Sequence, residues 1–173
     1  MVRFPPGFRL EALSSEHPRE PFTSGQEQVD RWLREQALQS QGKRLTSTRV
    51  LVAPTNELAG FFTLATGQVD FGDLPPVLAK KLPKRALPVA ILAWLGVAER
   101  LQGRGFGAML LAQALNDCFV AGKTFPFIAV ILDCVDEPTK QFYARWNFCE
   151  LPGRPLRLFL SASELKAMAE GAG

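Results

Sequence analysis

A glycine-rich turn, Gln102-Gly103-Arg104-Gly105-Phe106-Gly107, holds the residues with the clearest chemical potential. It follows an apolar run and leads directly into a helical pattern. The first N–H groups of a helix lack intrahelical acceptors, and glycines let a phosphate approach them closely. Arg104 adds a positive charge at the same place. The turn therefore predicts a pyrophosphate site, while a tight strand-to-helix turn that needs positive φ is an equally open interpretation.

Two other phosphate-binding motifs do not match this turn. A P-loop ends on Gly-Lys-Ser or Gly-Lys-Thr, whereas Gly107 is followed by Ala108 and Met109. The dinucleotide fingerprint needs a third glycine, which is missing after Gly103 and Gly105, and it belongs near the start of a domain. Neither a P-loop nor a dinucleotide site is predicted.

Rare residues limit the chemistry further. The 173 residues include one histidine, His17, and one tyrosine, Tyr143. A single histidine excludes two-histidine metal motifs and weakens the case for imidazole catalysis, so no metal is predicted. Three cysteines (Cys118, Cys134 and Cys149) form no C-x-x-C pair, which is typical of reduced thiols in a cytoplasmic protein.

The net charge of +3 is too small to indicate a polyanion partner, so any such argument depends on local clusters. One basic cluster consists of Lys80, Lys81, Lys84 and Arg85, and a second of Lys43, Arg44 and Arg49. Such clusters bind RNA phosphates in a salt-dependent way, or they are solvated charges on loops. The sequence leaves both interpretations open.

Hydrophobic patterning predicts one domain, 1–173, with a mixed sheet in an α/β or α+β fold. A helix is expected over about 26–41, because Val29, Trp32, Leu33 and Ala37 form one stripe. A hairpin is expected over 48–53 and 59–68, and a buried strand over 87–98. Further elements are helices at about 105–121 and 137–146 and strands at 127–132, 148–151 and 156–160.

Gln102-x-x-Gly105-x-Gly107, after a strand ending Trp94-Leu95-Gly96-Val97, resembles the acetyl-CoA signature of the GNAT superfamily of N-acetyltransferases. Within it, the chain is similar to toxins of type II toxin–antitoxin systems that acetylate aminoacyl-tRNA. The segments that carry this second resemblance are Val29–Leu33, Gly60–Ala65, Leu82–Val89, Asp136-Glu137 and Phe142-Tyr143.

The resemblance implies how acetyl-CoA binds. Backbone N–H groups of residues 103–107 would hold the pyrophosphate. The strand around Leu95, Gly96 and Val97 would splay from the strand at 127–132, and the pantetheine arm would lie in the opening. An N–H group near Leu95 or Val97 would then polarise the thioester carbonyl.

The resemblance also assigns Tyr143 the role of general acid. A phenol with a pKa near 10 can donate a proton to a departing thiolate of similar basicity. The residues alone equally allow a tyrosine that packs with Phe142 and Trp146 on one helix.

No general base is assigned. Asp133, Asp136 and Glu137 follow the strand at 127–132, and carboxylates at the start of a helix are more often caps. An aminoacyl ester amine has a low pKa for an amine, so a strong base is not needed for that acceptor.

Three functions remain open at this stage. The first is acetylation of a charged tRNA by a toxin held by a ribbon-helix-helix antitoxin. The second is acetylation of a small amine or a protein amino group, and the third is CoA binding without turnover. Trp94 and Ala98 stand where the toxins carry Arg and Asp, which bears on the acceptor and not on CoA. A homodimer is also expected.

Overall fold

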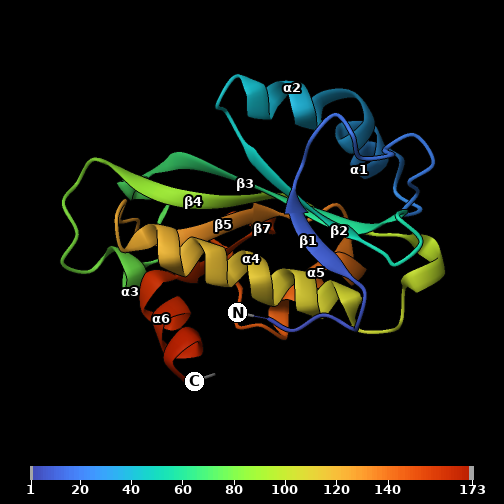
Figure 1. Ribbon diagram of the computed structural model, residues 1–173. Coiled ribbons are helices and arrows are strands. Elements are labelled where there is room, and N and C mark those ends of the chain that lie inside the picture. The colour runs from blue at the N-terminus through green and yellow to red at the C-terminus, as the bar shows by residue number, and fades with distance from the viewer. Residues whose placement is uncertain (1, 172–173) are drawn as a thin grey trace. The chain divides into compact units, whose positions relative to one another are not determined.

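The computed structural model describes residues 2–171 and contains a seven-stranded sheet with helices (Figure 1). The strand order is β1-β2-β3-β4-β5-β7-β6. The strands are β1 (Arg9–Ala12), β2 (Ser47–Val52), β3 (Leu58–Asp70), β4 (Ala86–Val97), β5 (Ala129–Asp133), β6 (Cys149–Leu151) and β7 (Arg154–Ser161). The helices are α1 (Glu27–Arg31), α2 (Ala37–Gly42), α3 (Pro76–Ala79), α4 (Phe106–Gly122), α5 (Glu137–Ala144) and α6 (Ala162–Gly171).

The sheet is mixed, as the sequence predicts. β4 pairs with β5 in parallel, and the pairs β1–β2, β2–β3, β5–β7 and β6–β7 are antiparallel. The parallel pair needs a long crossover, which α4 provides between β4 and β5. The expected α/β (α+β) class is confirmed.

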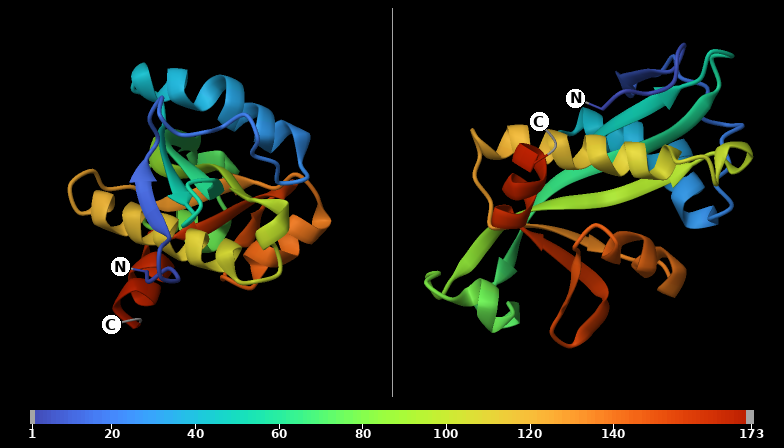
Figure 2. Two further views of the ribbon diagram at one scale, coloured as in Figure 1. Left: turned by 45° about the vertical axis from the view of Figure 1, so that its right-hand side comes forward. Right: turned by 90° about the horizontal axis from the view of Figure 1, so that it is seen from below.

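The chain divides into two compact units. The first comprises residues up to 65 and 92–115. In it, α1 and α2 lie over one face of the β1–β3 strands (Figure 2). Val29, Leu33 and Ala37 are buried there, so the predicted apolar stripe is confirmed.

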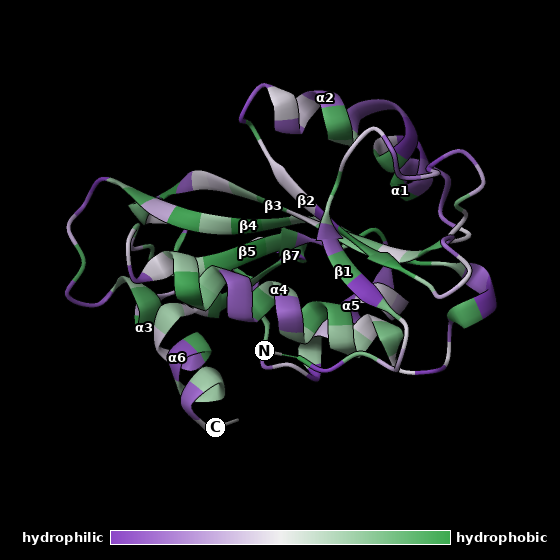
Figure 3. Cartoon of the chain, in the orientation of Figure 1, coloured by the Kyte–Doolittle hydropathy of each residue, from purple (hydrophilic) through white to green (hydrophobic). Residues whose placement is uncertain are grey.

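The second unit comprises residues 66–91 and 116 onward. Ala90 pairs with Val130 and Ile91 with Ile131, and Ile131 also pairs with Phe159 of β7. Its core gathers apolar side chains from β4, β5, β6 and β7, together with the segment around α3. Figure 3 shows that β4 and β5 are hydrophobic along much of their length.

Two features differ from the sequence-based expectation. The helix predicted over 26–41 is interrupted by a π-helical segment, Trp32–Gln36, between α1 and α2. The second is helix α6, which lies outside the expected elements. Ser161 and Glu164 form half of a capping box at its start, because the Glu164 N–H donates to Ser161 Oγ at 3.2 Å. Within residues 2–171, no helix has both the length and the apolar character that crossing a bilayer requires.

Candidate active site

The glycine turn joins the end of β4 to α4. A short 3₁₀ segment, Glu99–Leu101, follows the strand, and α4 begins at Phe106. Gly103 has φ +78° and Gly105 has φ +86°, conformations that favour glycine. A Cβ placed on either residue would have no atom within 4 Å. The glycines are thus required by the backbone conformation, and the space in front of them is open.

Backbone donors without acceptors lie in the same turn. The first backbone hydrogen bond of the helix runs from the Met109 N–H to the Gly105 carbonyl, at 3.1 Å. Within residues 2–171, the N–H groups of 103–108 have no acceptor. The positive end of the α4 dipole lies at the same place, and Arg104 is exposed beside it. Free N–H groups, a helix dipole and an arginine suit an anionic group such as a pyrophosphate.

Gln102 holds the turn through its side chain. Its Nε2 donates to the Val97 carbonyl at 2.9 Å and to the Ser24 carbonyl at 2.7 Å. Its backbone N–H donates to the Glu99 carbonyl at 3.2 Å. Since these donors are occupied, Gln102 positions the turn and does not itself present a donor to an anion.

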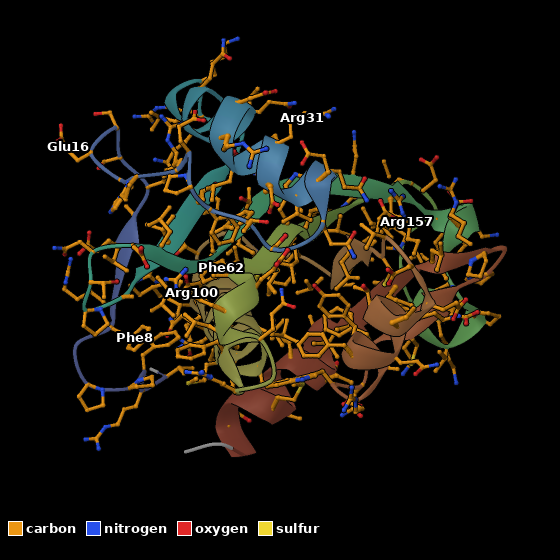
Figure 4. All side chains as sticks on the ribbon, turned by 90° about the vertical axis from the view of Figure 1, so that its right-hand side faces the viewer. Phe8, Glu16, Arg31, Phe62, Arg100 and Arg157 are labelled. Carbon is orange, nitrogen blue, oxygen red and sulfur yellow. The ribbon has the colours of Figure 1, made fainter. Side chains whose placement is uncertain are left out.

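Phe106 contributes its backbone alone to the open space. Its ring is buried, with its centroid 5.0 Å from that of Phe8, whose side chain is labelled in Figure 4. This contact anchors the first turn of α4 to the segment before β1.

The end of β4 is shaped by close packing. A Cβ on Gly96 would lie 2.8 Å from Val29 Cγ1 and 3.0 Å from Phe61 Cε1. A Cβ on Gly60 would lie 2.8 Å from the Gly96 carbonyl oxygen. Gly96 is therefore a packing requirement. Leu95 and Val97 on either side of it are half-buried.

Tyr143 lies on α5, and its ring is buried, with 6% of the residue exposed. The ring makes edge contacts with Phe142 at 5.1 Å and Phe148 at 5.8 Å between centroids. Every fully buried side-chain nitrogen or oxygen within residues 2–171 has a hydrogen-bond partner. The Tyr143 hydroxyl has none, so it is not fully buried. Burial raises its pKa, which keeps the phenol in its protonated form at neutral pH.

The family assignment follows from a direct match. The model of the acetyltransferase (GNAT) family matches residues 10–148. This chain is a GNAT acetyltransferase. The match includes the glycine turn and Tyr143, and it spans residues of both compact units. The expected GNAT fold and N-acetyltransferase activity are thereby confirmed, with acetyl-CoA as the co-substrate.

Relatives and solved structures agree with this assignment. A tRNA-acetylating toxin of Mycobacterium tuberculosis is 30% identical over 150 residues, which cover 85% of this chain and 87% of that protein. The structure of AtaT complexed with acetyl-methionyl-tRNAfMet has a TM-score of 0.85 at 22% identity, covering 94% of this chain and 99% of the other. A mutant AtaT toxin bound to the C-terminus of the antitoxin AtaR and acetyl-CoA has a TM-score of 0.79 at 19% identity, covering 94% and 98%. These two structures share the fold of this GNAT acetyltransferase.

Two carboxylates at the end of β5 and just beyond it, Asp133 and Asp136, are engaged in other contacts. Asp133 accepts from Arg157 Nε at 2.8 Å and Nη2 at 3.0 Å. This hydrogen-bonded pair holds the pKa of Asp133 below its ordinary value. Asp136 caps α5, with its Oδ1 accepting from the Thr139 N–H at 2.9 Å and from Thr139 Oγ1 at 2.6 Å. A carboxylate with a lowered pKa and a helix cap are both poor general bases.

Glu137 stands apart from the other two because it is largely exposed, 3.9 Å from Lys140 Nζ. Lys140 also forms an ion pair with Glu150. The hydrogen bond to Glu150 raises the pKa of Lys140, so this lysine stays charged and Glu137 stays beside a cation.

The cluster of Lys80, Lys81, Lys84 and Arg85 lies between α3 and β4, and all four side chains are exposed. None of them forms an ion pair within residues 2–171. Leu78 and Leu82 pack against the apolar core of the second unit and hold this segment in place. The cluster is thus a set of free cations on an anchored segment.

Proposed function

We propose that this acetyltransferase is a toxin that transfers the acetyl group of acetyl-CoA to the amino group of an aminoacyl-tRNA. The observation that carries the proposal is the 30% identity to a tRNA-acetylating toxin over 85% of the chain. The free cations at Lys80, Lys81, Lys84 and Arg85 support it, because a tRNA acceptor brings phosphates that need positive partners.

Acetyl-CoA is held by the chain from Leu95 to Gly107. The N–H groups of residues 103–107 bind the pyrophosphate, and Arg104 adds a charge-assisted contact. Gln102 and Phe106 contribute by fixing the turn. The backbone of Leu95, Gly96 and Val97 pairs with the pantetheine arm as an added strand would. An N–H group of Leu95 or Val97 donates to the thioester carbonyl as negative charge develops on its oxygen.

Tyr143 acts as the general acid. The neutral amine attacks the thioester carbon, a C–N bond forms and the C–S bond breaks. The sulfur leaves as a thiolate and takes the proton of the Tyr143 hydroxyl, while the amine loses a proton to water. The phenolate then recovers a proton from solvent, which the incompletely buried hydroxyl allows.

The low basicity of an aminoacyl ester amine makes a strong base unnecessary. A substantial fraction of such amines is neutral near pH 7. This fits the engagement of Asp133 by Arg157 and of Asp136 by the N-terminus of α5.

Further partners follow from the same proposal. The mutant AtaT toxin binds the antitoxin AtaR, and a ribbon-helix-helix antitoxin is proposed for this chain. We also propose a homodimer, one acetyltransferase domain over residues 1–173 and a cytoplasmic location, where charged tRNA is available.

Expression in a bacterial host tests the function. The proposal expects growth arrest, with acetylated aminoacyl-tRNA in RNA extracted under acidic conditions. The Tyr143→Phe variant, produced at the same level, should restore growth. Normal growth with unmodified tRNA, together with acetyl transfer to small amines or proteins by the purified chain, would contradict it.

A further inference from the structure

A nearly buried carboxylate lies behind the glycine turn. Asp30 on α1 is 3% exposed, and no cation pairs with it within residues 2–171. Burying an unpaired carboxylate is costly unless hydrogen bonds compensate. The burial of the Asp30 carboxylate therefore needs an explanation. The acid chemistry proposed for Tyr143 does not involve Asp30.

Both polar hydrogens of Ser24 are donated to one oxygen of Asp30. Its Oδ1 accepts from the Ser24 N–H at 2.9 Å and from the Ser24 hydroxyl at 2.7 Å. Hydrogen bonds to an ionised acceptor are short and strong. Ser24 Oγ also accepts from the Gln26 N–H at 3.2 Å. Asp30 thus fixes the conformation of the loop that precedes α1.

That loop holds the glycine turn through two carbonyls. The Ser24 carbonyl accepts from Gln102 Nε2 at 2.7 Å, and the Thr23 carbonyl accepts from the Glu99 N–H at 2.9 Å. Gln102 is held at the same time by the Val97 carbonyl at 2.9 Å. Gly103, the first of the free donors, follows Gln102 directly. A continuous series of hydrogen bonds therefore runs from Asp30 through Ser24 and Gln102 to the turn.

The geometry points to Asp30 as a positioning residue for acetyl-CoA: through Ser24 and Gln102 it holds the N–H groups of residues 103–107 in their binding arrangement. The inference rests on the proposed acetyl-CoA site and does not depend on which amine is acetylated. Donors that are already aimed bind an anion without the cost of ordering them, so loosening the loop weakens binding.

Calorimetry with acetyl-CoA and purified full-length variants tests this role. Asp30→Ala should weaken acetyl-CoA binding about 10-fold, because the turn loses its fixed orientation. Asp30→Asn should stay within about twofold of the original affinity, since its amide oxygen still accepts both bonds from Ser24. In steady-state kinetics, KM for acetyl-CoA should rise in Asp30→Ala while KM for the acceptor stays constant.

The coupling to Gln102 is the sharper test. Gln102→Leu keeps the size of the side chain and removes both donors, and it should weaken binding by a similar factor. If Asp30 acts through Gln102, the double variant should bind no more weakly than the worse single variant. If the fold loss of affinity in the double variant equals the product of the two single losses, the residues act separately, and the inference is overturned.

A matched control separates positioning from general stability. Leu38→Ala truncates a half-buried side chain that packs against the core around Val29 and Leu33. Leu38 takes no part in the series of hydrogen bonds from Asp30 to the turn. The substitution should lower the melting temperature and leave acetyl-CoA affinity unchanged when measured well below that temperature. If Asp30→Ala binds as well as Leu38→Ala, Asp30 is a stabilising residue only.

Two further outcomes are distinguishable. Should Asp30→Ala fail to fold, Ser24→Ala removes one of the two bonds and keeps the carbonyl; a weakening of less than about twofold would overturn the inference. Failure of the unaltered protein to bind acetyl-CoA would instead contradict the proposed binding site itself.

Discussion

Trp32 and Trp94 stack with their ring centroids 5.4 Å apart and their planes 13° from parallel. Trp32 begins the π-helical segment, and Trp94 stands one residue before Leu95 on β4. The Trp32 indole N–H donates to Thr63 Oγ1 at 3.0 Å, and Thr63 Oγ1 lies 2.7 Å from Thr48 Oγ1. Insertions of the π type often occur at functional sites. Here the segment places an oriented aromatic pair beside the strand proposed to hold the thioester.

The Thr63→Val variant should destabilise the protein by about 2 kcal/mol, because buried Thr48 and the Trp32 indole both lose a partner. Urea unfolding measures the change. Thr124→Val alters an exposed threonine and should be close to neutral. If Thr63→Val lowers the free energy of unfolding no more than Thr124→Val does, the pair of hydroxyl groups contributes nothing to stability.

The Tyr143→Phe variant should lower kcat at least about 100-fold, the usual contribution of a general acid. The Kd for acetyl-CoA should stay within about twofold, and the melting temperature should change little because the hydroxyl has no hydrogen bond to lose. Single-turnover acetylation together with calorimetry checks both expectations. Activity retained in the variant would reduce Tyr143 to a packing residue.

The Gly105→Ala variant should weaken acetyl-CoA binding about 10-fold, because a Cβ at φ +86° strains the turn and enters the space in front of the donors. Gly72→Ala is the control: a Cβ there also meets no atom within 4 Å, and its φ is not positive. Comparable affinity in the two variants would contradict a ligand at the turn.

Reversing charge in the basic cluster should weaken the reaction with the tRNA acceptor and leave acetyl-CoA binding unchanged. For Lys80→Glu/Lys84→Glu, kcat/KM for aminoacyl-tRNA should fall about 10-fold, and its salt dependence should become shallower. The Kd for acetyl-CoA should not change. Lys166→Glu, on α6, serves as the control. Equal kcat/KM in the unaltered protein, the double variant and the control would show that the cluster is solvated charge that does not contact the tRNA.

The Asp133–Arg157 pair should make stability depend on pH in the acid range. Hydrogen bonding from Arg157 holds the pKa of Asp133 below its ordinary value of 3.8. The pair's stabilisation is therefore present above that value and is lost as pH falls through the lowered pKa. Because the pair is largely exposed, the loss should not exceed about 1 kcal/mol. Thermal unfolding from pH 6 to pH 2 should show a smaller acid loss in Asp133→Asn than in the unaltered chain.

Much of the fold is predictable because its signals are local. Apolar runs and glycines predict β4 and α4 to within about one residue of Ala86–Val97 and Phe106–Gly122. The hairpin of β2 and β3 follows from alternation around a polar connection. The π-helical segment escapes such reasoning, because Val29, Leu33 and Ala37 keep one buried stripe whether or not the helix widens at Trp32.

The site is predictable only in part. Positive φ at Gly103 and Gly105 is implied by the residue type, and the position of Tyr143 follows from the family resemblance. The bonds that hold the turn are not predictable in the same way, since Ser24 and Gln102 are 78 residues apart in sequence. The pairing of Asp133 with Arg157, which makes that carboxylate a weaker base, spans 24 residues and also needs the folded sheet. Helix α6 is predictable in principle, because Ser161 and Glu164 have the spacing of a capping box.

The most direct test of the central claim is the identity of the acetylated atom. Purified protein, labelled acetyl-CoA and total tRNA, either charged or discharged, should be incubated together, and the amino acids released by mild alkali analysed by mass spectrometry. Label should appear as N-acetyl amino acids from charged tRNA and be absent from discharged tRNA. Label confined to small amines or protein, with charged tRNA unmodified, would contradict the claim.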